Sequence, residues 1–177
     1  SSAEVTVANL TGTGTIAVGL NAAVTIGTAK AGQAAGQSVG SAYAKANAIN
    51  SAGVSGLTAT ATNNIRLDVS NYAADAGASS VYNLTINGQS IFSQTVAAGG
   101  TITAQTIADT INSKSNDTGV SAVLNGGALL LSAADGRDIA IGQTVTGTAG
   151  TGGVVAGTAN TTVNGVTYNQ GTIGTVA

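Results

Sequence analysis

The sequence predicts an α+β protein dominated by antiparallel strands, arranged as two tandem units that each carry one covering helix. Three observations lead to this fold class. Short stretches alternate apolar and polar residues and are separated by Asn-Gly or Gly-rich turns. One stretch, residues 103–115, has its apolar residues at helical spacing instead. Finally, positions within residues 42–50 match positions within residues 104–112 at a constant offset of 62 residues.

Residues 1–75 are expected to form a first, degenerate unit with N-terminal strands. Strand-like alternation appears at residues 5–7 and again at 24–26. A helix is expected to follow, because four positions match the clearer helix of the second unit at a constant offset of 62: Ala42, Ala46, Ile49 and Asn50 against Ala104, Ala108, Ile111 and Asn112. Beyond the helix, residues 55–59 match 118–122 at an offset of 63, so one residue has been gained in the connection.

Residues 76–142 are expected to form the second unit, which opens with a hairpin. Its first strand places three apolar side chains on one face, and its second strand continues the apolar pattern: Tyr82, Leu84 and Ile86, then Ile91, Phe92 and Val96. Asn87-Gly88 between them is a two-residue turn signal. A helix over 103–115 follows, with Ala104, Ile107, Ala108 and Ile111 on its apolar face.

A second hairpin completes this unit. Two strands are expected on either side of Asn125-Gly126-Gly127, with these inward residues: Val120, Ala122 and Leu124, then Leu129, Leu131 and Ala133. Asp135-Gly136 then predicts a turn into a last short strand at 139–141. Arg137 and Asp138 are expected to form a solvated pair at the end of that strand.

Residues 143–177 are expected to supply Gly/Thr-rich strands that return to the first unit. Asn164-Gly165 predicts a hairpin turn there. Residues 147–160 hold five glycines and no charge, which predicts a loop or a poorly specified strand.

The composition excludes many function classes. Gly, Thr and Ala supply 85 of the 177 residues, and His, Cys, Met, Trp and Pro are absent. Without His or Cys there is no Ser-His-Asp or Cys-His pair, no zinc site of the usual ligands, no haem and no iron–sulfur cluster. A net charge of −2 without a basic cluster argues against a nucleic-acid partner. No apolar run approaches a membrane span, and residues 1–4 do not resemble a leader.

The remaining chemical candidates have simpler explanations. Residues 12–17 fit the G-x-G-x-x-A pattern, but no helix is expected after them and Gln37 stands where an acidic residue should be. Carboxylate pairs are the catalytic option that survives the loss of His and Cys: Asp135 and Asp138 are close in sequence, and Asp75, Asp109 and Asp117 are scattered. Asp135 and Asp138 could also bind a weak calcium ion. A glycosidase pair needs a facing geometry and, usually, aromatic side chains, and this chain has one Phe and four Tyr. We therefore expect no enzyme activity and no catalytic, cofactor-binding or metal-binding residues.

The middle of the chain resembles a known family. The resemblance rests on four strings: Leu84-Thr85-Ile86-Asn87-Gly88, Thr106-Ile107-Ala108-Asp109-Thr110-Ile111-Asn112, Thr118-Gly119-Val120-Ser121-Ala122, and Leu129 to Ile139, which contains Ala134-Asp135-Gly136-Arg137-Asp138. Together they resemble the flagellin IN motif, found in the variable outer region of bacterial flagellins and in hook-associated filament proteins, including the filament cap. The match is good over 84–141 and weak over 24–69.

The resemblance implies a structural role outside the bacterial cell, as the hypervariable, antigenic surface of the flagellar filament used in motility. The family brings no catalytic residues, and its matched Asn, Gly and Asp positions are expected to be turn formers. Self-assembly would use long terminal helices that this sequence does not contain. Host antibodies or surface glycans are the other partners that it implies. Two alternatives stay open: a hook-associated or cap protein, and a cell-surface adhesin or surface-layer repeat of similar composition.

Overall fold

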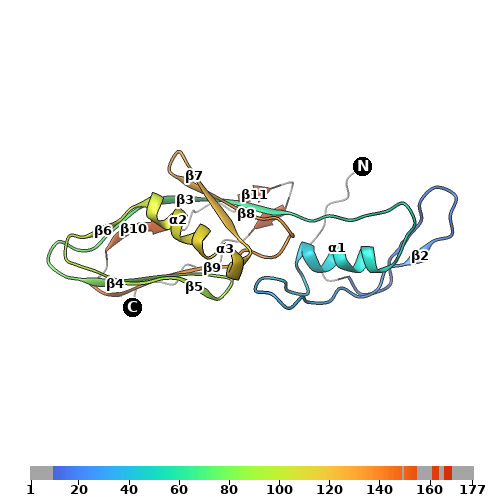
Figure 1. Ribbon diagram of the computed structural model, residues 1–177, viewed down its shortest axis with the longest axis horizontal. Coiled ribbons are helices and arrows are strands. Elements are labelled where there is room, and N and C mark those ends of the chain that lie inside the picture. The colour runs from blue at the N-terminus through green and yellow to red at the C-terminus, as the bar shows by residue number, and fades with distance from the viewer. Residues whose placement is uncertain (1–9, 149, 155–160, 164–165, 169–177) are drawn as a thin grey trace.

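The computed structural model describes residues 10–148, 150–154, 161–163 and 166–168. Strands hold 39% and helices 17% of the residues, and the named sheets are antiparallel, which confirms the strand-dominated class. The molecule is elongated (Figure 1). One end contains the sheets, α2 and α3, and we call residues 63–154 the sheet body. The other end contains α1 with β1 and β2, and we call residues 10–62 the α1 lobe.

The first predicted hairpin is present in the sheet body. β4 (Ser80–Ile86) and β5 (Gln89–Val96) pair around Asn87 and Gly88, whose φ angles of +52° and +77° are those of a type I′ turn. The register shifts between Leu84 and Thr85, so that consecutive residues of β5, Ile91 and Phe92, are both buried. β9 (Ile141–Gly147) pairs with the other edge of β4 and completes a three-stranded sheet.

The second sheet has the order β10-β3-β8-β7, with β6 (Thr101–Ile102) also paired to β3. Its strands are β3 (Asn63–Ala73), β7 (Ser121–Asn125), β8 (Ala128–Ala133) and β10 (Thr151–Val154). The predicted β7–β8 hairpin is confirmed, because Ala122 lies opposite Leu131 and Leu124 opposite Leu129. β7 is the edge strand, which leaves its outer backbone groups without a strand partner.

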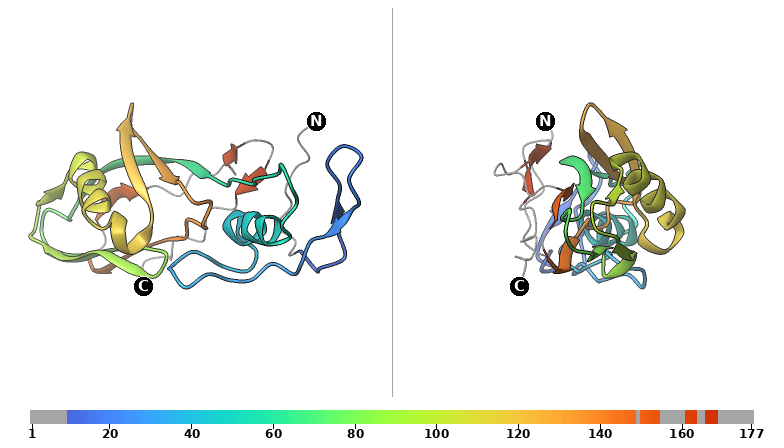
Figure 2. Two further views of the ribbon diagram at one scale, coloured as in Figure 1. Left: turned by 45° about the vertical axis from the view of Figure 1, so that its right-hand side comes forward. Right: turned by 90° about the vertical axis from the view of Figure 1, so that its left-hand side faces the viewer.

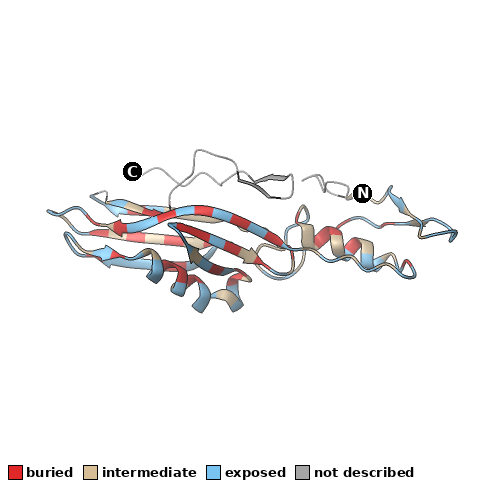
Figure 3. Cartoon of the chain, turned by 90° about the horizontal axis from the view of Figure 1, so that it is seen from above, coloured by how far each residue is buried: buried red, intermediate tan, exposed pale blue. Residues whose placement is uncertain are grey.

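The apolar core lies between the two sheets and under α2. The rings of Tyr72 on β3 and Tyr82 on β4 are 4.6 Å apart, so the sheets meet across these side chains. The predicted helix is α2 (Ala104–Ser113), followed by the single turn α3 (Ser115–Thr118). α2 contacts β7, β3 and β5 and buries Ile107, Ala108 and Ile111, as its spacing predicted. Buried residues alternate with exposed ones along most of β3 and with half-buried ones along β4 (Figure 3).

The α1 lobe has a much smaller core. β1 (Thr15–Ile16) and β2 (Val24–Thr25) form a short hairpin, and α1 (Ala42–Ser51) packs beside it. Four apolar residues are buried together there: Ile26, Ala29, Ala44 and Ala48. α1 therefore stands apart from the main core, as Figure 2 shows from a second direction.

Strand pairing links the predicted units to one another. β3 lies in the predicted first unit, 1–75, but pairs with β8 and contributes Ile65, Leu67 and Val69 to the core of the sheet body. The boundary after residue 142 falls inside β9. Of the predicted 143–177 strands, β10 pairs with β3, which is a strand of the first unit.

One strand expectation was wrong in its extent. The last strand was expected at 139–141, but β9 begins at Ile141 and runs to Gly147. The backbone before Ala140 leaves the sheet for the α1 lobe, because Asp138 N donates to Gly36 O at 2.7 Å.

The structure describes only part of the N-terminal and C-terminal segments. β11 (Thr161–Val163) and β12 (Val166–Tyr168) pair with Val163 opposite Val166, as expected for strands flanking Asn164-Gly165. Residues 5–7, 155–160 and 164–165 themselves lie outside the described residues. Over the described ranges, every helix is too short or too polar to cross a membrane.

Candidate functional site

Asp75, Asp109 and Asp117 lie on separate segments of the structure, whereas Asp135 and Asp138, the pair that the sequence offered for calcium, share one loop. Asp75 accepts a hydrogen bond from Gly77 N at 2.8 Å, and Asp109 accepts one from Gln105 at 2.9 Å on α2. Asp117 is exposed in α3, while Asp135 and Asp138 lie on the loop between β8 and β9. In the described part of the chain, no three His, Cys, Asp or Glu side chains gather where a metal ion could bind.

The G-x-G-x-x-A stretch has no phosphate-binding geometry either. Residues 12–17 contain β1, and the first helix after them begins only at Ala42. A dinucleotide site needs a helix N-terminus directly after the glycines.

A cluster of hydrogen-bonded polar side chains lies where the α1 lobe meets the sheet body. We call residues 135–138, together with the residues that hydrogen-bond to them, the junction. Arg137 is at its centre. Its Nε lies 3.0 and 3.1 Å from the two carboxylate oxygens of Asp135, and its Nη2 donates to Asp135 Oδ2 at 2.8 Å. The expected solvated pair of Arg137 with Asp138 was therefore wrong. The Arg137 side chain is only 13% exposed, because the turn at Gly136 brings Asp135 against it.

The same guanidinium ties two other segments together. Arg137 Nη1 donates to the carbonyl of Ala35 at 3.1 Å and to that of Thr118 at 3.3 Å. The group lies directly over Gly119, where an added Cβ would be 2.0 Å from Arg137 Cζ. Gly119 is thus required both for its φ of +69° and for the close approach of this side chain.

The α1 lobe meets the junction through the segment before α1. Gln37 Nε2 donates to Asp135 Oδ2 at 2.9 Å, and the Ser38 hydroxyl donates to Asp138. Gly36 fits closely against the sheet body, since a Cβ there would lie 2.5 Å from Asn87 Nδ2 and 2.7 Å from Asp138 O. The sequence had singled out Gln37 only as the absence of an acidic residue.

The electrostatics of the junction favour its ion pair. Burial raises the pKa of Asp135, but hydrogen bonds from Arg137 and Gln37 outweigh it and hold the pKa at about 2. Lys45 on α1 is buried, and burial lowers its pKa, opposed in part by the nearby charge of Asp138. Asp135 therefore stays ionised at neutral pH as a structural charge.

Asparagine side chains make the other cross-element bonds. Asn87 donates from Nδ2 to Thr118 O at 3.2 Å and accepts from Ala140 N at 2.9 Å. Asn63 is buried and donates to Arg137 O at 3.0 Å. Asn87 is a turn former as expected, but its bridging role was missed. The residues near Asn63 in the sequence do not indicate its role, because its partner Arg137 is 74 positions later in the chain.

Asn112 and Asn50 each exchange two hydrogen bonds with the backbone of one alanine, and they stand at matching positions of the two predicted units. Asn112 donates to Ala122 O at 2.8 Å and accepts from Ala122 N at 2.7 Å. Asn50 donates to Ala59 O at 2.9 Å and accepts from Ala59 N at 2.7 Å. The signal that could have found them was present in the sequence, since the Asn residues are 62 apart and the Ala residues 63 apart.

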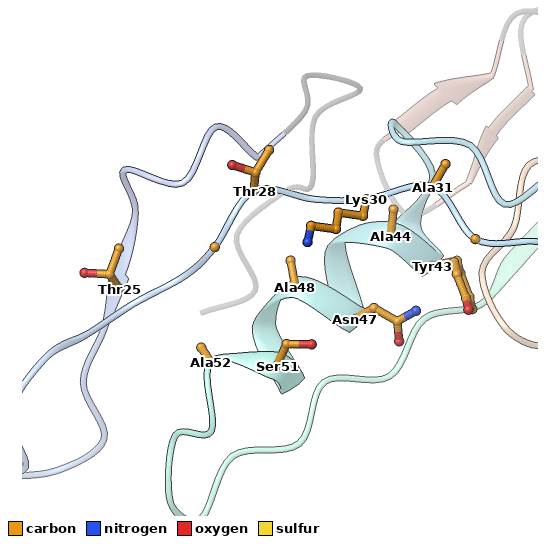
Figure 4. Close-up of a pocket in the computed structure, with 12 residues that line it drawn as sticks. Thr25, Thr28, Lys30, Ala31, Tyr43, Ala44, Asn47, Ala48, Ser51 and Ala52 are labelled. Atoms are coloured by element: carbon orange, nitrogen blue, oxygen red, sulfur yellow. The ribbon is translucent and has the colours of Figure 1, made fainter.

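A groove of about 470 Å³ lies between α1 and residues 25–32. Figure 4 shows Lys30 reaching into it from one wall, with Tyr43, Asn47 and Ser51 on the helix side. The rest of the lining consists of threonines, alanines and glycines. Its lining offers the amine of Lys30 and the phenol of Tyr43, but no carboxylate.

Comparisons with known proteins do not assign this chain. No protein-family model matches it, and no curated protein matches it significantly.

Proposed function

We propose that this chain is the surface-exposed outer region of a bacterial flagellin, with a structural role in the filament, and that it carries two tandem flagellin IN-like units. One observation carries this proposal: the residues on which the resemblance rests make the contacts that connect the elements of the fold. Asn87 and Asn112 bridge backbone segments, and Thr118, Gly119, Asp135 and Arg137 form the junction. Residues that act in this way give a framework whose surface can vary.

The two helices support the tandem-unit part of the proposal. Each is ten residues long, and each begins after a hydroxyl cap: Ser41 Oγ accepts from Ala44 N, and Thr103 Oγ1 from Thr106 N. The caps are 62 residues apart, as are Asn50 and Asn112. A glycine with positive φ follows each helix, at Gly56 and Gly119, which are 63 apart like the two Ala partners. The first unit differs in that its following strand, β3, is used by the sheet body.

A structural role without catalysis also agrees with the chemistry of the site. The half-buried side chains of Arg137 and Asp135 bond to each other, and Arg137 also bonds to backbone carbonyls, while Asp75 and Asp109 make hydrogen bonds within their own segments. Under this proposal the chain lies outside the cell on the flagellum. Its filament contacts are made by flagellin regions beyond this chain, and its surface meets host antibodies or glycans.

The proposal is tested by immunogold electron microscopy of the source bacterium with antibody raised against these 177 residues. Gold along the whole filament is expected for a major flagellin. Gold confined to the tip or to the hook junction would instead identify a hook-associated or cap protein. Gold on the cell body with bare filaments would overturn the flagellar assignment in favour of an adhesin or surface-layer protein. A strain lacking the gene is the control for antibody specificity.

A further inference from the structure

We propose that the surface formed by Thr118, Gly119 and residues 135–138 is a docking surface for the α1 lobe, and that the lobe keeps its fold only while it is docked there through Arg137. This inference concerns how the two ends of the molecule depend on each other. It is independent of where the protein acts.

The α1 lobe is too thinly packed to fold by itself. Its buried core contains one Ile and three Ala, and Leu10, Ile16 and Ile49 pack against it only partly buried. Fully burying an Ile side chain contributes about 1.5–3 kcal/mol, while an Ala contributes less. Ordering a backbone costs about 1–2 kcal/mol per residue, and the lobe spans residues 10–62. Isolated helices shorter than about 12–15 residues are marginal in water, and α1 has ten residues. The lobe must therefore gain stability from contacts outside itself.

The hydrogen bonds that the lobe makes just before α1 and in its first turn converge on residues 135–138 of the sheet body. On the side before α1, Ala35 O, Gly36 O, Gln37 and Ser38 all bond to residues 135–138, and Tyr43 N in the first turn of α1 donates to Gly136 O at 2.9 Å. On the side after α1, Ala61 packs closely against Gly136. A Cβ added to Gly136 would lie 2.4 Å from the Cβ of Ala61. The loop thus holds the chain both where it enters and where it leaves the α1 segment.

Arg137 joins the loop both to the rest of the sheet body and to the α1 lobe. It anchors the loop to the sheet body through Thr118 O, and it reaches the lobe through Ala35 O and through Asp135, which in turn accepts from Gln37. Hydrogen bonds to charged groups are worth more than neutral ones, and a partner left buried and unpaired is costly. Loss of the guanidinium would therefore open the lobe before the sheet body unfolds.

The test is hydrogen exchange followed by mass spectrometry on the full chain, comparing peptides from α1 with peptides from α2. In Arg137→Gln, we expect α1 amides to exchange at least about tenfold faster while α2 amides keep their protection. Arg66→Gln is the matched control, because Arg66 also pairs with an aspartate two residues away but is 56% exposed on β3. It should leave both helices unchanged.

A second pair of variants changes only the lobe. Gly36→Ala puts a methyl group against Asn87 and Asp138, at a φ of +80°. Gly19→Ala also falls at a positive φ, +64°, but has no atom within 4 Å of the added group. We expect faster α1 exchange in Gly36→Ala than in Gly19→Ala, with α2 unchanged in both. If α1 stays protected in both junction variants, or if α1 and α2 lose protection together in Gly36→Ala, the proposal is wrong. Should Arg137→Gln fail to fold, the glycine pair decides.

Discussion

Asn112 and Ala122 exchange two hydrogen bonds, at 2.8 and 2.7 Å, in the way that two paired strands do. Ala122 lies on β7, the edge strand of its sheet, and its strand partner β8 is on the other side. The amide side chain of Asn112 therefore takes the place of the missing neighbour and fixes the end of α2 to the edge of the sheet. An edge strand with satisfied backbone groups is also a poorer template for pairing with another chain.

Replacing Asn112 with Ala should remove both bonds and leave two backbone groups of a buried residue unpaired. We expect a loss of about 2 kcal/mol in the free energy of unfolding, measured by urea denaturation. Asn112→Asp is the informative companion, because a carboxylate still accepts from Ala122 N but cannot donate to its carbonyl. Its cost should lie between wild type and Asn112→Ala, and equal costs for both variants would show that only the donated bond matters.

The equivalent change in the α1 lobe should behave differently. Asn50 makes the same pair of bonds to Ala59, but these lie at an exposed site and Ala59 is outside any strand. Asn50→Ala should cost about 1 kcal/mol or less in global stability, because water can replace the lost partners. The comparison uses the same urea titration. A loss as large as that of Asn112→Ala would contradict the assignment of the lobe as the less stable part.

Substitutions at Gly119 and Gly126 distinguish the cost of a strained backbone conformation from the cost of a steric clash. Both have positive φ, +69° and +56°, but an added Cβ meets the Arg137 guanidinium at Gly119 and nothing within 4 Å at Gly126. We expect Gly126→Ala to cost about 1–2 kcal/mol, from the left-handed conformation alone. Gly119→Ala should cost about 2 kcal/mol more, because Arg137 must move away from its carbonyl partners. Equal melting shifts in calorimetry would mean that Arg137 adjusts freely.

The junction should make stability depend on pH in the acid range. Burial opposes ionisation of Asp135, but Arg137 and Gln37 hold its pKa at about 2, below the value near 4 of an unfolded chain. A depressed carboxyl pKa stabilises the fold above the unfolded value, and that contribution is lost as the pH falls from about 4 to about 2. With allowance for partial exposure, it amounts to about 1 kcal/mol.

The measurement is the free energy of unfolding at about pH 5 and about pH 2.5, for wild type and for Asp135→Asn. Wild type should lose about 1 kcal/mol more than the variant between the two conditions, because the other carboxylates titrate in both proteins. If the two proteins lose the same amount, Asp135 does not carry the charge assigned to it.

Tyr72 and Ser80 form a buried pair that suits a double-mutant cycle. Their hydroxyl oxygens are 2.6 Å apart between β3 and the first residue of β4. Tyr72→Phe or Ser80→Ala alone should cost about 1–2 kcal/mol, since each leaves the other hydroxyl buried without its partner. The double variant should cost clearly less than the sum of the single ones. Additive costs in denaturant titrations would show that the two hydroxyls do not depend on each other.

Much of the sheet body could be predicted because its signals are local. The Asn87-Gly88 turn, the alternation along β4 and the apolar spacing of α2 each involve residues within one turn or strand of each other. Each pattern has one simple solution that buries its apolar face. The bulge that buries both Ile91 and Phe92 shows the limit of this reasoning, because strict alternation would expose one of them.

The junction could not be predicted, because its bonds join residues about a hundred positions apart. Gln37 meets Asp135, and Ser38 meets Asp138, only after the chain has passed through α1 and the whole sheet body. The sequence therefore suggested a solvated Arg137–Asp138 pair from nearness in the chain, whereas folding buries Arg137 against Asp135 and two carbonyls.

The sequence by itself determined the strand-dominated class, the hairpins with their turns and the position of α2, because period, turn residues and helix caps act over a few residues. It also determined what chemistry is absent, since a chain without His or Cys lacks whole classes of site. Only the tertiary structure decided that β3 joins the core of the sheet body and that Arg137 ties the α1 lobe to it. Such contacts depend on which surfaces meet, and that is fixed by burial over the whole molecule and not by any short pattern.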